Sequence, residues 1–143
     1  MQIEILSFTW NLFKSDNVES VTAMTKVWEI TILKDHTPLV TVLKPSVISV
    51  VYISDSWEKK EEDFAIGWWV LEVSNSKIKV LIDMLISVSD IDIDEAEKAK
   101  KQAMEMMEKY KDAKDKVDME RFIEAEDLLL KSVAHLKLSD LKK

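Results

Sequence analysis

Short apolar runs fill the first 90 residues and alternate with polar side chains. This period-two pattern, interrupted by turn residues, is typical of half-buried β-strands. We expect strands over 3–8, 18–27, 39–43, 47–53, 64–66, 70–73, 77–82 and 85–88. Many short strands separated by turns predict an antiparallel β-sandwich or barrel.

Turn residues separate these predicted strands. Pro38 and Pro45 bracket the run 39–43, because proline cannot donate a ladder hydrogen bond inside a sheet. Ser74-Asn75-Ser76 separates two alternating runs and predicts a hairpin, with Asn75 in the left-handed conformation. The run 58–63 contains only charged residues, and we expect a solvated loop there.

The pattern changes after residue 90 to apolar positions three and four residues apart, which predicts amphipathic helices. Asp92 followed by Glu95 resembles an N-terminal capping box, and the polar run 111–116 predicts a turn. The first apolar stripe comprises Ile93, Ala96, Ala99, Ala103, Met106, Met107 and Tyr110. The second comprises Met119, Phe122, Ile123, Leu129, Leu130, Val133 and Leu136. Together they predict an antiparallel two-helix hairpin.

Composition divides the chain at the same point. Charged residues make up 21 of the first 90 positions and 26 of the remaining 53. We therefore expect a β-sandwich domain over 1–90 and a helical hairpin over 91–143.

The net charge of −7 argues against a general binder of nucleic acid or anionic membranes, since both ligands favour a basic surface. The longest strongly apolar run, 47–53, is too short to span a bilayer, and the first residues lack a signal-peptide pattern. We expect a soluble intracellular protein. With no cysteine and two histidines, the chain offers no disulfide and no zinc–cysteine site.

Candidate catalytic chemistry is sparse. One glycine in the whole chain excludes the Gly-rich loops that cradle phosphates. The acidic cluster of Asp90, Asp92, Asp94 and Glu95 suggests either a hard-cation site, a carboxylate-based hydrolase or helix capping; its place at a helix start favours capping. The residues alone predict a protein without cofactor that works by contact.

Several segments nevertheless resemble a known family, in the same order and over nearly the full length. The most specific is EITILKDHTPLVTVLKPSVISV (29–50), preceded by VESVTA (18–23) and followed by FAIGWWVLEVSNSKIKVLID (64–83). IDIDEAEKAKKQAME (91–105) and AEDLLLKSVAHLKL (125–138) resemble the family's two C-terminal helices. The family is the epsilon subunit of bacterial and chloroplast rotary F-type ATP synthases, called delta in mitochondria.

The resemblance implies a non-catalytic rotor subunit at the cytoplasmic face of the bacterial plasma membrane, bound to the membrane only indirectly. Its sandwich would hold the gamma subunit and contact the c-ring, while its helices would regulate ATP hydrolysis through the alpha/beta catalytic head. The implied c-ring contacts are Glu29, Thr31, Lys34, Asp35 and His36. The implied head contacts are Lys131, His135 and Lys137, in a segment with four lysines and one aspartate.

One departure from the family concerns nucleotide. Some relatives begin the first helix with an I/L-D-x-x-R-A motif that helps to bind a regulatory ATP. Here the segment is IDIDEA, so Asp92 and Ala96 remain while Glu95 replaces the arginine. Because an anion then stands where a phosphate-attracting cation would, we predict weak or absent ATP binding.

A second departure concerns the five tryptophans beside one glycine. Trp28, Trp68 and Trp69 fall on glycines of the family pattern, and Trp10 and Trp57 fall near others. TGA is read as glycine in some bacterial lineages and as tryptophan in others. Two interpretations remain open: recoded glycine positions, or genuine tryptophans that fill the sandwich surface.

The alternative to a rotor subunit is a stand-alone interaction module, a sandwich with a helical hairpin recruited to another partner. Co-purification distinguishes the two, because a rotor subunit requires a stable complex with a gamma-like coiled coil.

Overall fold

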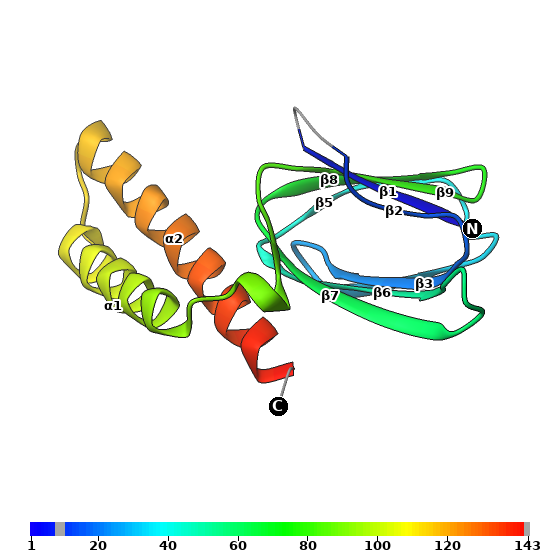
Figure 1. Cartoon of the computed structure of the whole chain (residues 1–143). Coiled ribbons are helices and arrows are strands. Elements are labelled where there is room, and N and C mark those ends of the chain that lie inside the picture. Colours follow the sequence, from blue (N-terminus) through cyan, green and yellow to red (C-terminus); the bar gives the residue numbers. More distant parts are fainter. Residues whose placement is uncertain (8–10, 142–143) are drawn as a thin grey trace.

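The computed structural model describes residues 1–7 and 11–141 (Figure 1), so Trp10 lies outside the described residues. The strands are β1 (Gln2–Ser7), β2 (Asn11–Ser15), β3 (Val18–Met24), β4 (Glu29–Leu33), β5 (Leu39–Leu43), β6 (Ser46–Ile53), β7 (Lys59–Ile66), β8 (Trp69–Ser74), β9 (Lys77–Ile82) and β10 (Leu85–Ser87). The helices are the short 3₁₀-helix η1 (Val88–Asp90), α1 (Ile93–Tyr110) and α2 (Lys116–Leu141). A β-sandwich followed by a helical hairpin confirms the predicted fold class.

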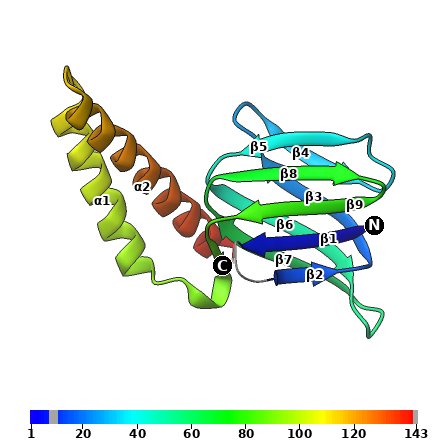
Figure 2. The same cartoon turned by 90° about the horizontal axis from the view of Figure 1, so that it is seen from above.

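The strands form two five-stranded sheets that pack face to face (Figure 2). The first sheet has the order β2-β1-β9-β8-β5, and the second has the order β10-β7-β6-β3-β4. All neighbouring pairs are antiparallel except β1 and β9, which run parallel. Alternate residues of both sheets point inward and form the core, including Ile3, Ile5, Val21, Ile32, Ile48, Val50, Leu71, Ile78 and Val80. Burying the inner faces of both sheets accounts for the alternation in the sequence.

The charged run 58–63 is not a loop: residues 59–63 belong to β7, and the prediction of a loop was wrong. Residues 59–63 form a strand because side chains of the neighbouring strand β6 bind two of its carboxylates. Ser49 donates a hydrogen bond to Asp63, and Tyr52 donates one of 2.5 Å to Glu62. The hydrogen bond to Glu62, together with burial, raises the pKa of Tyr52 to about 12.

Two short strands, β2 and β4, were not predicted. Each has five residues and few of its side chains are buried, so the apolar pattern is weak. Tertiary contacts stabilise both strands: Phe13 of β2 packs against the rings of Tyr52 and Phe64, and Ile32 of β4 is buried in the core.

The hairpin between β8 and β9 forms as predicted. Asn75 and Ser76 both have positive φ, 49° and 57°, which is the pattern of a two-residue type I′ turn.

The first C-terminal helix begins where its polar residues predict, and the predicted turn over 111–116 separates the helices except for Lys116, which is the first residue of α2. The Asp92 side chain accepts a hydrogen bond of 3.0 Å from the Glu95 backbone N–H, which caps α1. Asp115 accepts one of 2.8 Å from the Asp118 backbone N–H, and α2 begins at the next residue. Ala96, Ala103 and Ala125 are the buried apolar residues that let the helices approach closely. Met119 and Ile123 of the second predicted stripe are exposed, because only one face of α2 meets α1.

The hairpin contacts the sandwich through one end of α2, while the turn between the helices lies far from the sheets (Figure 1). Ala134 and Leu138 of α2 pack against Ala65 of β7, with Val47, Ile86 and Ile91 at the margin of this small cluster.

Candidate functional site

Exposed apolar side chains gather on one part of the sandwich, which we call the apolar surface. It covers the free edge formed by β4 and β5 and continues onto the outer face of the first sheet. Its members are Val27, Trp28, Val40, Val42, Trp68, Val70 and Leu81.

Strand register aligns three of these residues in a row. Val42 of β5 lies opposite Val70 of β8, and Val70 lies opposite Leu81 of β9. Their sequence neighbours Leu43, Leu71 and Val80 point into the core, so the row lies on the outer face of the sheet. Together with Trp68 it lines a shallow cavity of about 360 Å³ that reaches Asp83 at the end of β9.

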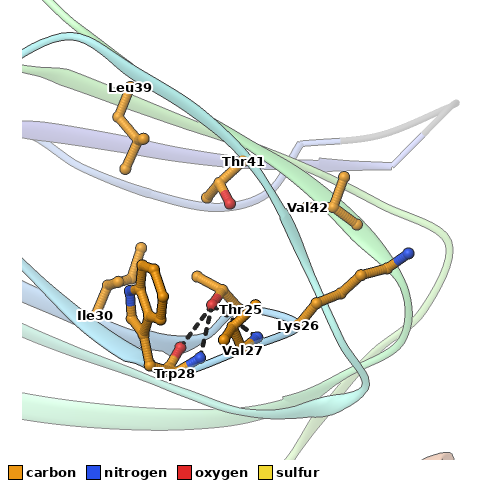
Figure 3. Close-up of a pocket in the computed structure, with 8 residues that line it drawn as sticks. All are labelled: Thr25, Lys26, Val27, Trp28, Ile30, Leu39, Thr41 and Val42. Atoms are coloured by element: carbon orange, nitrogen blue, oxygen red, sulfur yellow. Dashed lines mark hydrogen bonds between the residues drawn. The ribbon is translucent and has the colours of Figure 1, made fainter.

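A second cavity, also about 360 Å³, lies between the edge strands of the two sheets (Figure 3). Trp28 and Ile30 line it from β4 and the preceding turn, and Leu39, Thr41 and Val42 line it from β5. Because Val42 borders both cavities, they form one continuous surface.

Thr25 holds the turn that carries Trp28. Its hydroxyl donates a hydrogen bond of 2.7 Å to the Trp28 carbonyl and accepts bonds of 3.2 and 3.1 Å from the Val27 and Trp28 backbone N–H groups. The neighbouring Lys26 ammonium lies 5.6 Å from the centre of the Trp68 ring. These contacts join the edge of the sandwich to the outer face of the first sheet.

The apolar surface is suited to binding a protein. It offers neither a nucleophile with an adjacent base nor convergent titratable groups, and large exposed apolar patches mark interaction sites. Within the described residues there is no group of three or more histidine, aspartate or glutamate side chains arranged to hold a metal ion. Across the same residues, no helix combines the length and apolar character needed to cross a membrane.

The five residues that the family resemblance assigns to the c-ring do not form one loop. Glu29 and Thr31 belong to β4, where Thr31 shares a hydrogen bond of 3.0 Å with Thr22 of β3. Lys34, Asp35 and His36 follow the strand in a turn, with Asp35 at φ 65°. Glu29 and His36 therefore lie at opposite ends of β4. Glu29 and Thr31 lie on its exposed face, and His36 lies in the turn that follows the strand.

Asp92 and Ala96, the two retained residues of the nucleotide motif, lie beside a cavity of about 290 Å³ between the hairpin and η1. Both have structural roles, because Asp92 caps α1 and Ala96 is buried against α2. The cavity is also lined by Asp90, Glu95 and Lys131, so carboxylates outnumber cations around it.

The three predicted head contacts differ in exposure. Lys137 is exposed, whereas His135 is half-buried and its Nε2 is buried without a hydrogen-bond partner. Burial lowers the pKa of His135 and outweighs the nearby charge of Glu95. The Lys131 ammonium is in ion pairs with Asp127 at 2.9 Å and Asp83 at 3.5 Å. Lys131 and His135 thus face the sandwich and η1 in this arrangement.

Sequence reasoning missed the apolar surface, although one feature of the strands indicates it. In a strand with one solvated face, every second residue is polar. The runs LVTVL (39–43) and WVLEV (69–73) instead carry apolar side chains on both faces. The excess apolar side chains are those that the structure leaves exposed.

Comparison with known proteins gives concordant results. A family model described as the β-sandwich domain of the ATP synthase delta/epsilon chain matches residues 1–88. An ATP synthase epsilon chain of Hydrogenovibrio crunogenus is 37% identical over 75% of this chain and 70% of its own length. One from Neisseria meningitidis is 30% identical over 98% of this chain and 93% of its own. A chain in the cryo-EM structure of the Euglena gracilis mitochondrial ATP synthase with its c-ring shares the fold, with a TM-score of 0.77 and 18% identity, over 94% of this chain and 78% of that one.

Proposed function

Because this chain belongs to the ATP synthase delta/epsilon chain family, whose members are non-catalytic subunits of the complex, we propose that it joins a gamma-type shaft to the c-ring. It would act as a rotor subunit, held peripherally at the cytoplasmic face of the bacterial plasma membrane through its partners. The observation that carries the proposal is the apolar surface, since it gathers seven exposed apolar side chains on one part of the sandwich.

The gamma-type subunit would cover the apolar surface. Removing the row of Val42, Val70 and Leu81 from water supplies binding free energy. Within the described residues, β4 and β5 are edge strands of their sheets, and β5 is bridged to Thr25 at Leu43. The c-ring would meet the exposed face of β4, through Glu29 and Thr31, and the turn Lys34–His36. Polar side chains there suit the polar loops of a ring.

The helical hairpin would regulate ATP hydrolysis through the catalytic head. Support comes from the exposed apolar side chains Met119, Ile123 and Val133 of α2, which the sandwich leaves uncovered. Lys131 and His135 would become available to the head only when α2 leaves the sandwich. Removing residues 91–143 and measuring hydrolysis tests this regulatory role.

A charge within the apolar surface tests gamma binding. We expect Val70→Asp to weaken co-purification with the gamma subunit of the same organism by about a hundredfold or more, because binding would bury an unpaired carboxylate. Val42→Asp should weaken gamma binding to the same extent. The affinity of each variant is measured from the fraction of gamma that co-purifies with it, at more than one salt concentration.

Leu12→Asp is the matched control: Leu12 is 40% exposed at the opposite edge of the first sheet, against 45% for Val70. It should keep gamma bound, and thermal melting should show all three variants folded. Undiminished binding by the folded Val70→Asp variant, or an equal loss in the Leu12→Asp control, would refute the assignment of the apolar surface to gamma. Failure of the unmodified chain to bind gamma would favour a stand-alone module.

A further inference from the structure

The contact that fixes the hairpin to the sandwich is small. Its buried members are two alanines and one leucine, Ala65, Ala134 and Leu138. Because apolar stabilisation scales with buried area, this cluster alone gives the docked hairpin little free energy. Polar contacts across the same junction therefore contribute appreciably to the equilibrium between the docked and the free hairpin.

An ion pair of described residues crosses this junction. Lys131 of α2 lies 3.5 Å from the carboxylate of Asp83, the residue that directly follows β9. Asp127, one helical turn earlier on α2, holds the same ammonium at 2.9 Å and so directs it toward the sandwich. The Lys131 and Asp83 side chains are 24% and 47% exposed, so solvent screens this pair less than it screens the Lys116–Glu120 pair of α2, whose side chains are 89% and 60% exposed.

The charge state of Lys131 supports the pairing. Burial lowers the pKa of Lys131, but the hydrogen bond and charge of Asp127 and the charge of Asp83 outweigh it. Its pKa therefore lies above the usual value, and the side chain stays protonated near neutral pH.

The chain's single glycine lies against this ion pair. A Cβ atom at Gly67 would overlap the Asp83 carboxylate and lie 3.3 Å from Cε of Lys131. Gly67 does not have a positive φ, so its backbone conformation does not require glycine. Position 67 instead lacks room for a side chain. A Cβ atom there would displace the Asp83 carboxylate rather than any backbone atom.

We infer that Asp83, Lys131 and Gly67 form a latch that holds the helical hairpin on the sandwich. Asp83 and Lys131 supply the attraction, and the absence of a side chain at position 67 lets them meet. The inference deepens the proposed regulatory function, on which its biological meaning rests, by naming the contact that must open before α2 can reach another partner.

Distance measurements between the sandwich and the hairpin test the latch. The chain has no cysteine, so spin labels on the exposed positions of a Glu61→Cys, Glu105→Cys variant report on docking without background. Recording the distance distribution through a urea series gives a docking midpoint even where the hairpin is fully docked in water. We expect Asp83→Asn and Lys131→Gln to lower the docked-to-free ratio about twofold to fivefold.

Gly67→Ala should lower the ratio in the same direction by displacing the Asp83 carboxylate. Because both changes act on one contact, adding Gly67→Ala to Asp83→Asn should cause no further loss. Lys111→Gln is the matched control, since it removes a Glu108–Lys111 pair that lies within the hairpin, and it should leave the ratio unchanged. An unchanged ratio in Asp83→Asn, or additive losses in the double variant, would overturn the latch.

Failure of the latch and failure of the proposed function give different results. If removal of residues 91–143 alters hydrolysis while Asp83→Asn leaves docking unchanged, the regulatory role stands and the latch is wrong. If Asp83→Asn releases the hairpin but removal of 91–143 leaves hydrolysis unchanged, the latch stands without that role.

Discussion

Trp57 has a left-handed backbone conformation, with φ 62°, in the turn between β6 and β7, and its side chain is 89% exposed. A tryptophan there gains little from burial and bears the steric cost of positive φ. Trp69 differs, because it is 4% exposed within the core, although its indole N–H is buried without a partner. Trp28 and Trp68 have negative φ. The backbone thus favours glycine at position 57 and does not require it at the other described tryptophans.

Glycine substitutions separate these positions. We expect Trp57→Gly to raise the free energy of unfolding by about 1 kcal/mol, because the relief of left-handed strain exceeds the entropy that glycine adds to the unfolded chain. Trp69→Gly should lower it by about 3 to 5 kcal/mol through the cavity left in the core. Urea denaturation measures both changes. A loss of stability in Trp57→Gly would contradict the strain argument.

The gene itself tests the recoding interpretation. If the cell reads TGA as glycine, the codons for Trp10, Trp28, Trp57, Trp68 and Trp69 are TGA, and peptides from the native subunit have the lower mass of glycine at those positions. TGG codons would show that the tryptophans are genuine.

Among the secondary-structure elements, the start of α1 carries the clearest chemical departure from nucleotide-binding relatives. Its first turn holds Asp94 and Glu95 beside the capping Asp92, which stabilises the helix through the macrodipole. Asp92 and Glu95 also line the adjacent cavity, together with Asp90, and the Lys131 ammonium there is already paired with Asp83 and Asp127. A triphosphate would meet carboxylates there and no free cation among the described lining residues.

We therefore expect isothermal titration of the full chain with ATP to give no binding in the micromolar range. Glu95→Arg restores the cation of the relatives' motif, and it should strengthen ATP binding by at least several-fold if charge alone prevents it. Micromolar affinity of the unmodified chain would contradict this reading of the cavity.

At the scale of the whole molecule, a sandwich with an extensive core is joined to a hairpin by few contacts. The sandwich core is continuous, with buried residues from both sheets, whereas the hairpin reaches it only through the end of α2. The sandwich can therefore act as a fixed binding unit, whereas the position of the hairpin depends on a small docking free energy. This division suits a subunit whose sandwich stays attached while its helices respond to the state of the complex.

Removing residues 91–143 should leave the sandwich folded and bound to gamma, because the apolar surface and the core lie within residues 1–90. On the proposed regulatory role, hydrolysis by the reconstituted complex should rise severalfold once the two helices are absent. Parallel measurement of retained gamma separates loss of inhibition from loss of assembly. An unchanged hydrolysis rate with the truncated subunit bound would remove the regulatory role.

The sequence by itself determined the fold class and most elements, because the alternation of strands and the stripes of helices are local consequences of burial. It also determined the turn at Asn75, the caps at Asp92 and the family. Local patterns failed at β2, at β4 and at residues 59–63, where cross-strand partners outweigh composition.

Only the tertiary structure decided which apolar residues remain exposed and which charges meet. Val42, Val70 and Leu81 are far apart in the chain, and strand register alone brings them into one row. Gly67, Asp83 and Lys131 likewise meet because β9 ends beside the docked end of α2. A sequence specifies such long-range contacts only through the packing of the whole molecule. Their free energy depends on distances between residues far apart in the chain, which no local sequence pattern encodes.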